Sequence, residues 1–407
     1  MQDNEKKPAL RFKGFTDPWE QRKFSDITFP AGEKNRDNLP LESYSITNEH
    51  GFIPQDEKFE NGGTMREADK RMYYIVSPNS FAYNPARINV GSIGYQNTGK
   101  DVIVSSLYEV FKTSDDVDDR LLWHWFKSPD FQKLIFQLQE GGVRLYFYYD
   151  KLCMGTVSLP SLEEQRKIGQ FFDSLDTLIT LHQRKYEKLV NIKKSMLDKM
   201  FPPNGASVPE IRFKGFTDPW EQRKLGELSC SFEYGLNAAA KEYDGQNKYL
   251  RITDIDDTSR QFVTTDITSP DTNLTDADSY KLSDGDVLFA RTGASVGKTY
   301  LYKKFDGLVY FAGFLIRAKI KEGVNAGFIF QNTLTRGYER YIAITSQRSG
   351  QPGVNAQEYA EYQLMLPELF EQDKIAKLLE ALDTLITLHQ REHIKPILEV
   401  KRVKRNE

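Results

Sequence analysis

The chain has 407 residues, more than a single hydrophobic core usually serves, so two or more domains are expected. Hydrophobic residues make up 39% and charged residues 28%, a composition that excludes a wholly disordered or fibrous protein. The net charge of −3 is compatible with nucleic-acid binding only where basic residues gather on one face.

Targeting and redox features predict a cytoplasmic protein. We find no apolar run of about 18 residues and no apolar segment behind the charged N-terminus, so neither a membrane span nor a secretory signal is expected. Cys153 and Cys230 form no CxxC or Cys/His cluster, which favours reduced, buried thiols.

A head segment near the N-terminus occurs twice. Residues 11–23 read RFKGFTDPWEQRK, and the same thirteen letters return at residues 212–224. Identity over this length indicates an internal repeat, so the chain consists of two halves.

The bodies that follow the heads, roughly 25–158 and 225–365, share few letters but a common order of patterns. Runs such as 101–105 and 287–290 predict strands, and each body then has two helical stretches before a Gly-rich loop. A constant frame around divergent bodies suggests one shared partner and two different ligands. The alternative is a recent duplication whose loops have drifted.

Each half ends in a segment with the pattern of a long helix. Residues 162–200 carry an apolar heptad, residues 366–395 match it, and the decapeptide LDTLITLHQR occurs in both. A helix of 39 residues would be about 58 Å long, more than the 34–36 Å or so between successive major-groove faces of DNA. We expect the helices to pack antiparallel as a coiled coil through Ile168, Leu175, Leu178, His182 and Leu189 of the first and Ile375, Leu382, Leu385 and His389 of the second.

Two features of these helices need interpretation. His182 and His389 occupy the same repeat position, but no carboxylate or Cys completes a ligand set, so we interpret them as register-fixing polar residues and expect no metal site. Pro396 should end or kink the second helix.

The predicted fold is α+β, with two mixed α/β domains, two long helices and a pseudo-two-fold internal repeat. The expected segments are a first domain at 1–158, a helix at 159–200, a linker at 201–211, a second domain at 212–365, a helix at 366–395 and a basic tail at 396–407.

Catalytic motifs are missing, so we expect no enzymatic activity of the chain by itself. Gly293–Thr299 resembles a phosphate-binding loop, but it has three residues between its glycines where the P-loop has four. No GxSxG, HExxH or GxGxxG motif occurs.

Polar, Gly-containing loops instead predict nucleic-acid binding, because glycines let the backbone approach phosphates and Arg or Gln can read base edges. The candidate DNA-binding residues are Asn84, Arg87, Ser92 and Tyr95 in the first body and Arg291, Thr292, Ser295, Lys298, Gln347 and Arg348 in the second.

The sequence resembles the specificity subunits of type I restriction-modification systems over essentially its whole length. The residues that carry the resemblance are the two WEQRK heads, the LPxLxEQ entries into the helices, the doubled LDTLITLHQR, and GDVLFARTG at 285–293.

The resemblance implies a non-catalytic subunit in which two target recognition domains each read half of a bipartite, asymmetric DNA site, with two conserved helices between them as a ruler. It implies partners as well: double-stranded DNA, two modification subunits and two restriction subunits. S-adenosylmethionine, ATP and Mg would be bound by those subunits and not by this chain.

Two other functions stay open from the residues alone. A two-domain adaptor would bind proteins or small ligands through its bodies, and dispersal of Arg291, Lys298 and Arg348 would favour it over DNA binding. A nucleotide hydrolase would depend on the loop at Gly293.

Overall fold

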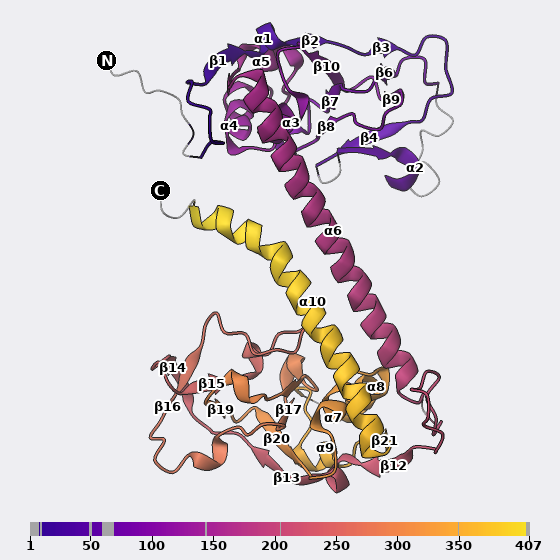
Figure 1. Cartoon of the computed structure of the whole chain (residues 1–407), viewed down its shortest axis with the longest axis vertical. Helices are drawn as coiled ribbons and strands as arrows, with labels where there is room; N and C mark the ends of the chain where they lie inside the picture. Colours follow the sequence, from indigo (N-terminus) through magenta and orange to yellow (C-terminus); the bar gives the residue numbers. More distant parts are fainter. Residues whose placement is uncertain are drawn as a thin grey trace. The chain divides into compact units, whose positions relative to one another are not determined.

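The computed structural model describes residues 8, 10–48, 51–58, 69–142, 145–203, 205–348 and 350–403, with side chains as far as Gln390. The chain forms two compact units, Met1–Ile179 and Thr180–Glu407. Figure 1 shows a mixed α and β body in each unit, together with the long helices α6 (Leu162–Met200) and α10 (Leu369–Val403). The boundary between the units falls inside α6.

The first unit is built on an antiparallel sheet of order β2-β10-β7-β8, covered by α3 and α4. Ser128 caps α4 through its side chain, and Pro129 begins the helix, where a missing N–H costs nothing. The elements of this body are β1 (Glu20–Lys23), α1 (Phe24–Ile27), β2 (Thr28–Pro30), β3 (Glu33–Lys34), β4 (Tyr44–Thr47), β5 (Gly51–Pro54), α2 (Gln55–Lys58), β6 (Tyr74–Val76), β7 (Phe81–Tyr83), β8 (Ile93–Tyr95), β9 (Val102–Val104), β10 (Glu109–Thr113), α3 (Asp119–Phe126), α4 (Pro129–Leu138), α5 (Tyr149–Met154) and β11 (Thr156–Leu159).

The second unit repeats the plan with a sheet of order β13-β20-β17-β18, in which neighbouring strands are antiparallel. The expected strand at 287–290 is β17. The elements of the second body are β12 (Glu221–Lys224), β13 (Ser229–Tyr234), β14 (Ala239–Glu242), β15 (Lys248–Leu250), β16 (Thr268–Asp271), β17 (Val287–Ala290), β18 (Thr299–Leu301), β19 (Val309–Phe311), β20 (Leu315–Ile320), α7 (Ala326–Asn332), α8 (Arg336–Thr345), α9 (Ala356–Ala360) and β21 (Gln363–Leu366).

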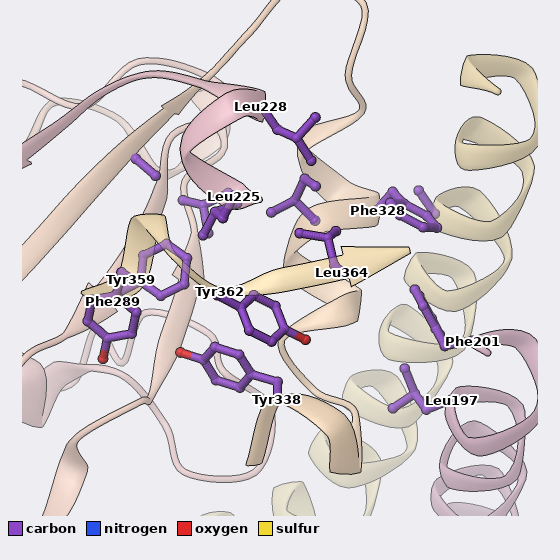
Figure 2. Packing of buried hydrophobic residues seen from close by; sticks show 14 of the residues in the cluster. Leu197, Phe201, Leu225, Leu228, Phe289, Phe328, Tyr338, Tyr359, Tyr362 and Leu364 are labelled. Atoms are coloured by element: carbon purple, nitrogen blue, oxygen red, sulfur yellow. The ribbon is translucent and has the colours of Figure 1, made fainter. Parts of the chain in front are cut away.

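The main core of the second unit joins its sheet to the end of α6. Phe289, Tyr338 and Tyr359 lie in the body, and Leu197 and Phe201 reach the same cluster from α6 and the residue after it (Figure 2). Phe201 also contacts the rings of Trp220 and Phe328, with centroids 6.2 and 5.2 Å away. The start of the predicted linker is therefore packed against the body.

The repeated heads attach each body to the first turn of its long helix. Arg11 donates two hydrogen bonds to Glu164, of 2.8 and 2.6 Å, and Arg212 donates two to Glu371, of 2.7 and 2.8 Å. Both carboxylates are almost completely buried. Each head then pairs antiparallel with the strand before the helix, β1 with β11 and β12 with β21.

Within the second unit, the end of α6 packs against α10. His182 Nδ1 lies 3.2 Å from His389 Nδ1, and Lys193 forms an ion pair with Asp383. Residue numbers rise along α6 while they fall along α10, so the two helices are antiparallel, as predicted.

The buried face of α10 differs in part from the predicted seam. Ile375 and His389 are buried as expected, but Leu385 is 43% exposed and Ile386 beside it is buried. The buried residues Ile375, Leu379, Ile386 and His389 keep a heptad spacing, but its second position lies at 379 and 386, one residue later than predicted, and α10 packs on α7 as well as on α6. On α6, Leu178 is exposed, while Ile168, Leu175 and Leu189 are half-buried.

Two smaller expectations were wrong in part. Pro396 does not end the second helix, because α10 continues through it to Val403, and a kink at this residue stays a prediction. Cys230 is an exposed free thiol, because it points outward from β13, and Cys153 is half-buried.

The head-to-helix ion pair predicts a large loss of stability on mutation. Arg212→Ala would leave the Glu371 carboxylate buried without its partner, at a cost of about 3–5 kcal/mol. Arg223→Ala removes an exposed pair with Glu227 and should cost less than about 1 kcal/mol. Urea unfolding of the two variants measures the difference, and equal midpoints would contradict the structural role of Arg212.

Candidate nucleic-acid interface

In the second unit, the ends of three neighbouring strands lie side by side at one end of the main sheet, which we call the sheet edge. β13 ends at Tyr234, β17 ends next to Arg291, and β20 begins just after Phe314. The backbone N–H of Arg291 donates to the Phe314 carbonyl over 3.0 Å. Tyr234 and Phe314 are 44% and 59% exposed, so the edge presents two aromatic rings beside a guanidinium.

The guanidinium of Arg291 is held in a defined place. It lies 5.0 Å from the centre of the Tyr234 ring, and Nη1 donates weakly to the Gly313 carbonyl over 3.4 Å. A planar guanidinium on an aromatic face keeps further donors for a bidentate contact. Arg291 is only half-buried, so a ligand can reach it.

The two predicted loops of this unit meet here. Thr292 forms an isolated antiparallel β-bridge with Gly353, and the Gly293 N–H donates to the Pro352 carbonyl over 3.0 Å. Gln347 and Gln351 are exposed on the second loop. The structure therefore joins Arg291 and Thr292 to the segment that follows Gln347.

Unlike Arg291, Lys298 and Arg348 are not available to a ligand as unpaired cations. Gly297 turns the chain with φ +82°, and Lys298 then points inward, where Nζ donates to the Ile255 carbonyl over 3.1 Å and pairs with Asp257. This ion pair lowers the pKa of the Asp257 carboxyl. Arg348 donates to the carbonyls of Thr345 and Gln347 and pairs with Glu358.

This placement argues against Lys298 as a DNA contact, because only 9% of its side chain is exposed. Arg291, Lys298 and Arg348 therefore do not form the group of free cations that would have favoured DNA binding over an adaptor. Ser295 is half-buried in the same loop, and its contact with DNA stays a prediction.

In the first unit, the equivalent strand β7 ends at Tyr83, next to Asn84. Asn84, Arg87, Ser92 and Tyr95 all lie on the β7–β8 hairpin. Arg87 is exposed at its tip, while Asn84 is half-buried and its side-chain oxygen accepts the Ala86 N–H over 3.0 Å.

Two of these four residues have structural partners. Ser92 is buried and donates to the Ile46 carbonyl over 3.0 Å. Tyr95 is half-buried and donates to Asn79 over 2.8 Å, and its burial raises the pKa of the phenol to about 12. Arg87 and Asn84 are therefore the accessible predicted residues of this hairpin.

Besides Tyr95, the aromatic side chains at the two sites were not predicted from the sequence. In the first unit, the rings of Tyr146 and Tyr148 are parallel, 5.5 Å apart, and the N–H of Phe147 between them donates to Pro85 in the hairpin loop. The continuous aromatic run Tyr146–Tyr149 was a usable sequence signal, because aromatic residues favour extended, half-buried segments. Tyr234 and Phe314 had no comparable signal, because strand pairing alone brings them together.

Comparison with known proteins decides the family. The sequence profile of the "Type I restriction modification DNA specificity domain" matches residues 52–191 and 217–398. The chain belongs to this family. It is a DNA specificity subunit of a type I restriction-modification system, the non-catalytic member of such a complex.

Individual relatives are distant. The chain is 22% identical over 306 residues to the type I restriction enzyme MjaVIII specificity subunit of Methanocaldococcus jannaschii, covering 72% of this chain and 70% of the relative. It is 22% identical over 360 residues to the EcoKI specificity subunit of Escherichia coli, covering 85% and 75%. A crystal structure of a type I S subunit from M. genitalium shares the fold, with a TM-score of 0.58, 13% identity and coverage of 98% and 97%.

Two other kinds of site, a metal centre and a membrane-spanning helix, are absent from the described residues. Over the part of the chain that the structure describes, no three His, Cys, Asp or Glu side chains are grouped as metal ligands would be. Within the same residues, no helix combines the length and apolar composition that a membrane crossing requires.

The inward placement of Lys298 yields a testable prediction. Lys298→Met should lower the stability of the second unit by about 1–3 kcal/mol, because the Ile255 carbonyl loses its buried donor. The ratio of affinities for specific and random duplexes should stay unchanged in the folded variant. Unfolding and fluorescence anisotropy measure the two quantities, and a lost preference with intact stability would restore Lys298 as a base reader.

Proposed function

We propose that each body reads one half of a bipartite, asymmetric DNA site and that the long helices set the spacing between the halves. The observation that carries this proposal is the edge of the main sheet in each unit. The equivalent strand leads into a loop in both units, but the residues of the loop differ: Arg291 on the Tyr234 ring follows β17, whereas Asn84 and the exposed Arg87 follow β7. Equivalent places with different chemistry suit two unlike half-sites.

The domain boundaries that follow from the repeat belong to this proposal. Residues 1–158 and 212–365 are the target recognition domains, and the segments at 159–200 and from 366 onward are the spacer helices. The head at the start of each domain is bound to the first turn of the following long helix through its Arg–Glu pair.

The spacer helices also dock partner proteins in this proposal. Leu378, Leu385 and Leu388 are 36–48% exposed and lie on one face of α10. Their repeat equivalents on α6, Phe171, Leu178 and Leu181, are 48–56% exposed. Exposed apolar stripes mark interaction sites.

The partners that we propose are two modification subunits on these stripes and two restriction subunits in the complete complex. Adenine methylation with S-adenosylmethionine and DNA cleavage driven by ATP and Mg then take place on those subunits. This chain supplies the recognition of the DNA sequence.

Base reading by Arg291 can be tested directly. Arg291→Ala should weaken binding to the specific duplex by about 1–3 kcal/mol, the cost of a lost bidentate base contact, and should leave random DNA nearly unaffected. Arg291→Lys should not restore the loss, because an ammonium lacks the planar fork. Anisotropy titrations of both duplexes provide the measurement.

The matched control for Arg291 is Arg340→Ala, an exposed arginine of α8. Equal losses on specific and random duplexes for Arg291→Ala would leave a phosphate contact and reject base reading at this position.

Docking through α10 gives a separate test. The double change Leu385→Asp and Leu388→Asp places charges on the stripe and should weaken association with the modification subunit by about tenfold or more, since each buried Leu contributes about 1.5–3 kcal/mol. Ile344→Asp, at an exposed apolar residue of α8, is the control. Co-purification of the double variant at wild-type yield would reject this docking surface.

A further inference from the structure

The second unit contains a cavity of about 560 Å³ beside the proposed DNA interface. It lies between the end of α6, α10, α8 and two loops, 257–260 and 294–298. Its volume is within the range of about 300–1,000 Å³ typical of ligand pockets. Val190, Val296, Ile342 and Ile386 provide apolar wall, so a few polar groups determine what can bind.

Arg260 is the least satisfied of these polar groups. Its backbone has φ +58°, the left-handed position of a tight turn in which the Arg260 N–H donates to the Asp256 carbonyl and the Asp256 N–H donates to the Gln261 carbonyl. Its side chain is half-buried, yet within the described residues the guanidinium makes no hydrogen bond or ion pair. Burial lowers the pKa of this guanidinium, which stays charged at neutral pH.

Asp256, Asp257 and Glu339 attract this charge, but within the described residues none of them forms an ion pair with Arg260. Asp257 is paired with Lys298, and Asp383 is paired with Lys193 and accepts a hydrogen bond of 2.8 Å from Gln331. Four cations and three carboxylates line the cavity, so their sum is +1: Lys193, Lys194, Arg260 and Lys298 against Asp257, Glu339 and Asp383.

The cations without ion-pair partners among the described residues are Arg260 and Lys194, and the unpaired carboxylate is Glu339. The hydroxyl of Ser295 and the amide of Gln390 line the same space. A guanidinium, an ammonium and neutral donors around one cavity match the needs of a phosphate group.

We propose that this cavity binds a phosphate group, with Arg260 as its bidentate ligand and Lys194 as the second cation. The phosphate has two possible sources, a free mononucleotide or the backbone of bound DNA. The DNA source rests on the function proposed above, because the 294–298 wall of the cavity belongs to the loop that begins at Arg291.

The variant that tests the proposal is Arg260→Gly. Glycine accepts a positive φ without strain, so the variant should unfold at the same denaturant concentration as the wild type or a higher one. Its binding of inorganic phosphate and of adenosine monophosphate, measured by calorimetry on the full chain, should be weaker by about tenfold or more. Arg340→Ala is the matched control and should bind like the wild type.

Glu339→Gln provides a test with the opposite sign. It removes the unpaired carboxylate from the cavity, so phosphate should bind more tightly than to the wild type. Arg260→Lys keeps the charge without the fork and should bind with intermediate affinity.

The DNA source has its own readout. If a backbone phosphate occupies the cavity, Arg260→Gly should reduce the slope of log affinity against log salt by about one, equally for specific and random duplexes. A changed slope without binding of free phosphate assigns the cavity to DNA, and binding of free phosphate with an unchanged slope assigns it to a mononucleotide.

The proposal is overturned if Arg260→Gly alters neither phosphate binding nor the salt slope. This failure differs from that of the proposed function, which depends on Arg291→Ala and sequence preference. A loss of stability in Arg260→Gly without any change in binding would also reject the site and leave Arg260 a structural residue.

Discussion

A buried, doubly hydrogen-bonded pair between an arginine and a glutamate holds each half of this molecule together. Arg11 with Glu164, and Arg212 with Glu371, join the head, the body and the first turn of the long helix at one point. A buried carboxylate tolerates no loss of its partner, so the residues that position the arginine are constrained as well. This constraint gives a physical reason for thirteen identical residues beside bodies that share so few.

The same frame explains how the bodies can differ without changing the fold. Strand pairing of the head with the strand before the helix fixes both ends of each body, and the main sheets have equivalent strand orders. The loops at the sheet edge take no part in this strand pairing, so their residues can change while the fold stays the same. Arg291 on the Tyr234 ring in one unit and Asn84 in the other therefore follow equivalent strands with different chemistry.

Much of this architecture could be predicted from the sequence, because repeats and helical periods are local patterns. The two bodies, the strand at 287–290 and the antiparallel long helices were predictable in this way. The orientation of Lys298 was not, since it depends on the turn at Gly297 and on Asp257 from a separate loop. Leu385 and Ile386 show a similar limit, because α10 packs on a globular body and on a second helix at once. Aromatic groups such as Phe314 become part of the site only through strand pairing.

The contact between His182 and His389 has a consequence for symmetry. These histidines are equivalent residues of the two repeats, and in an antiparallel pair equivalent residues can meet only where a local dyad crosses the pair. Close to that point, α6 from Thr180 onward faces the copy of its own sequence in α10, so the contact between the two helices is locally self-complementary.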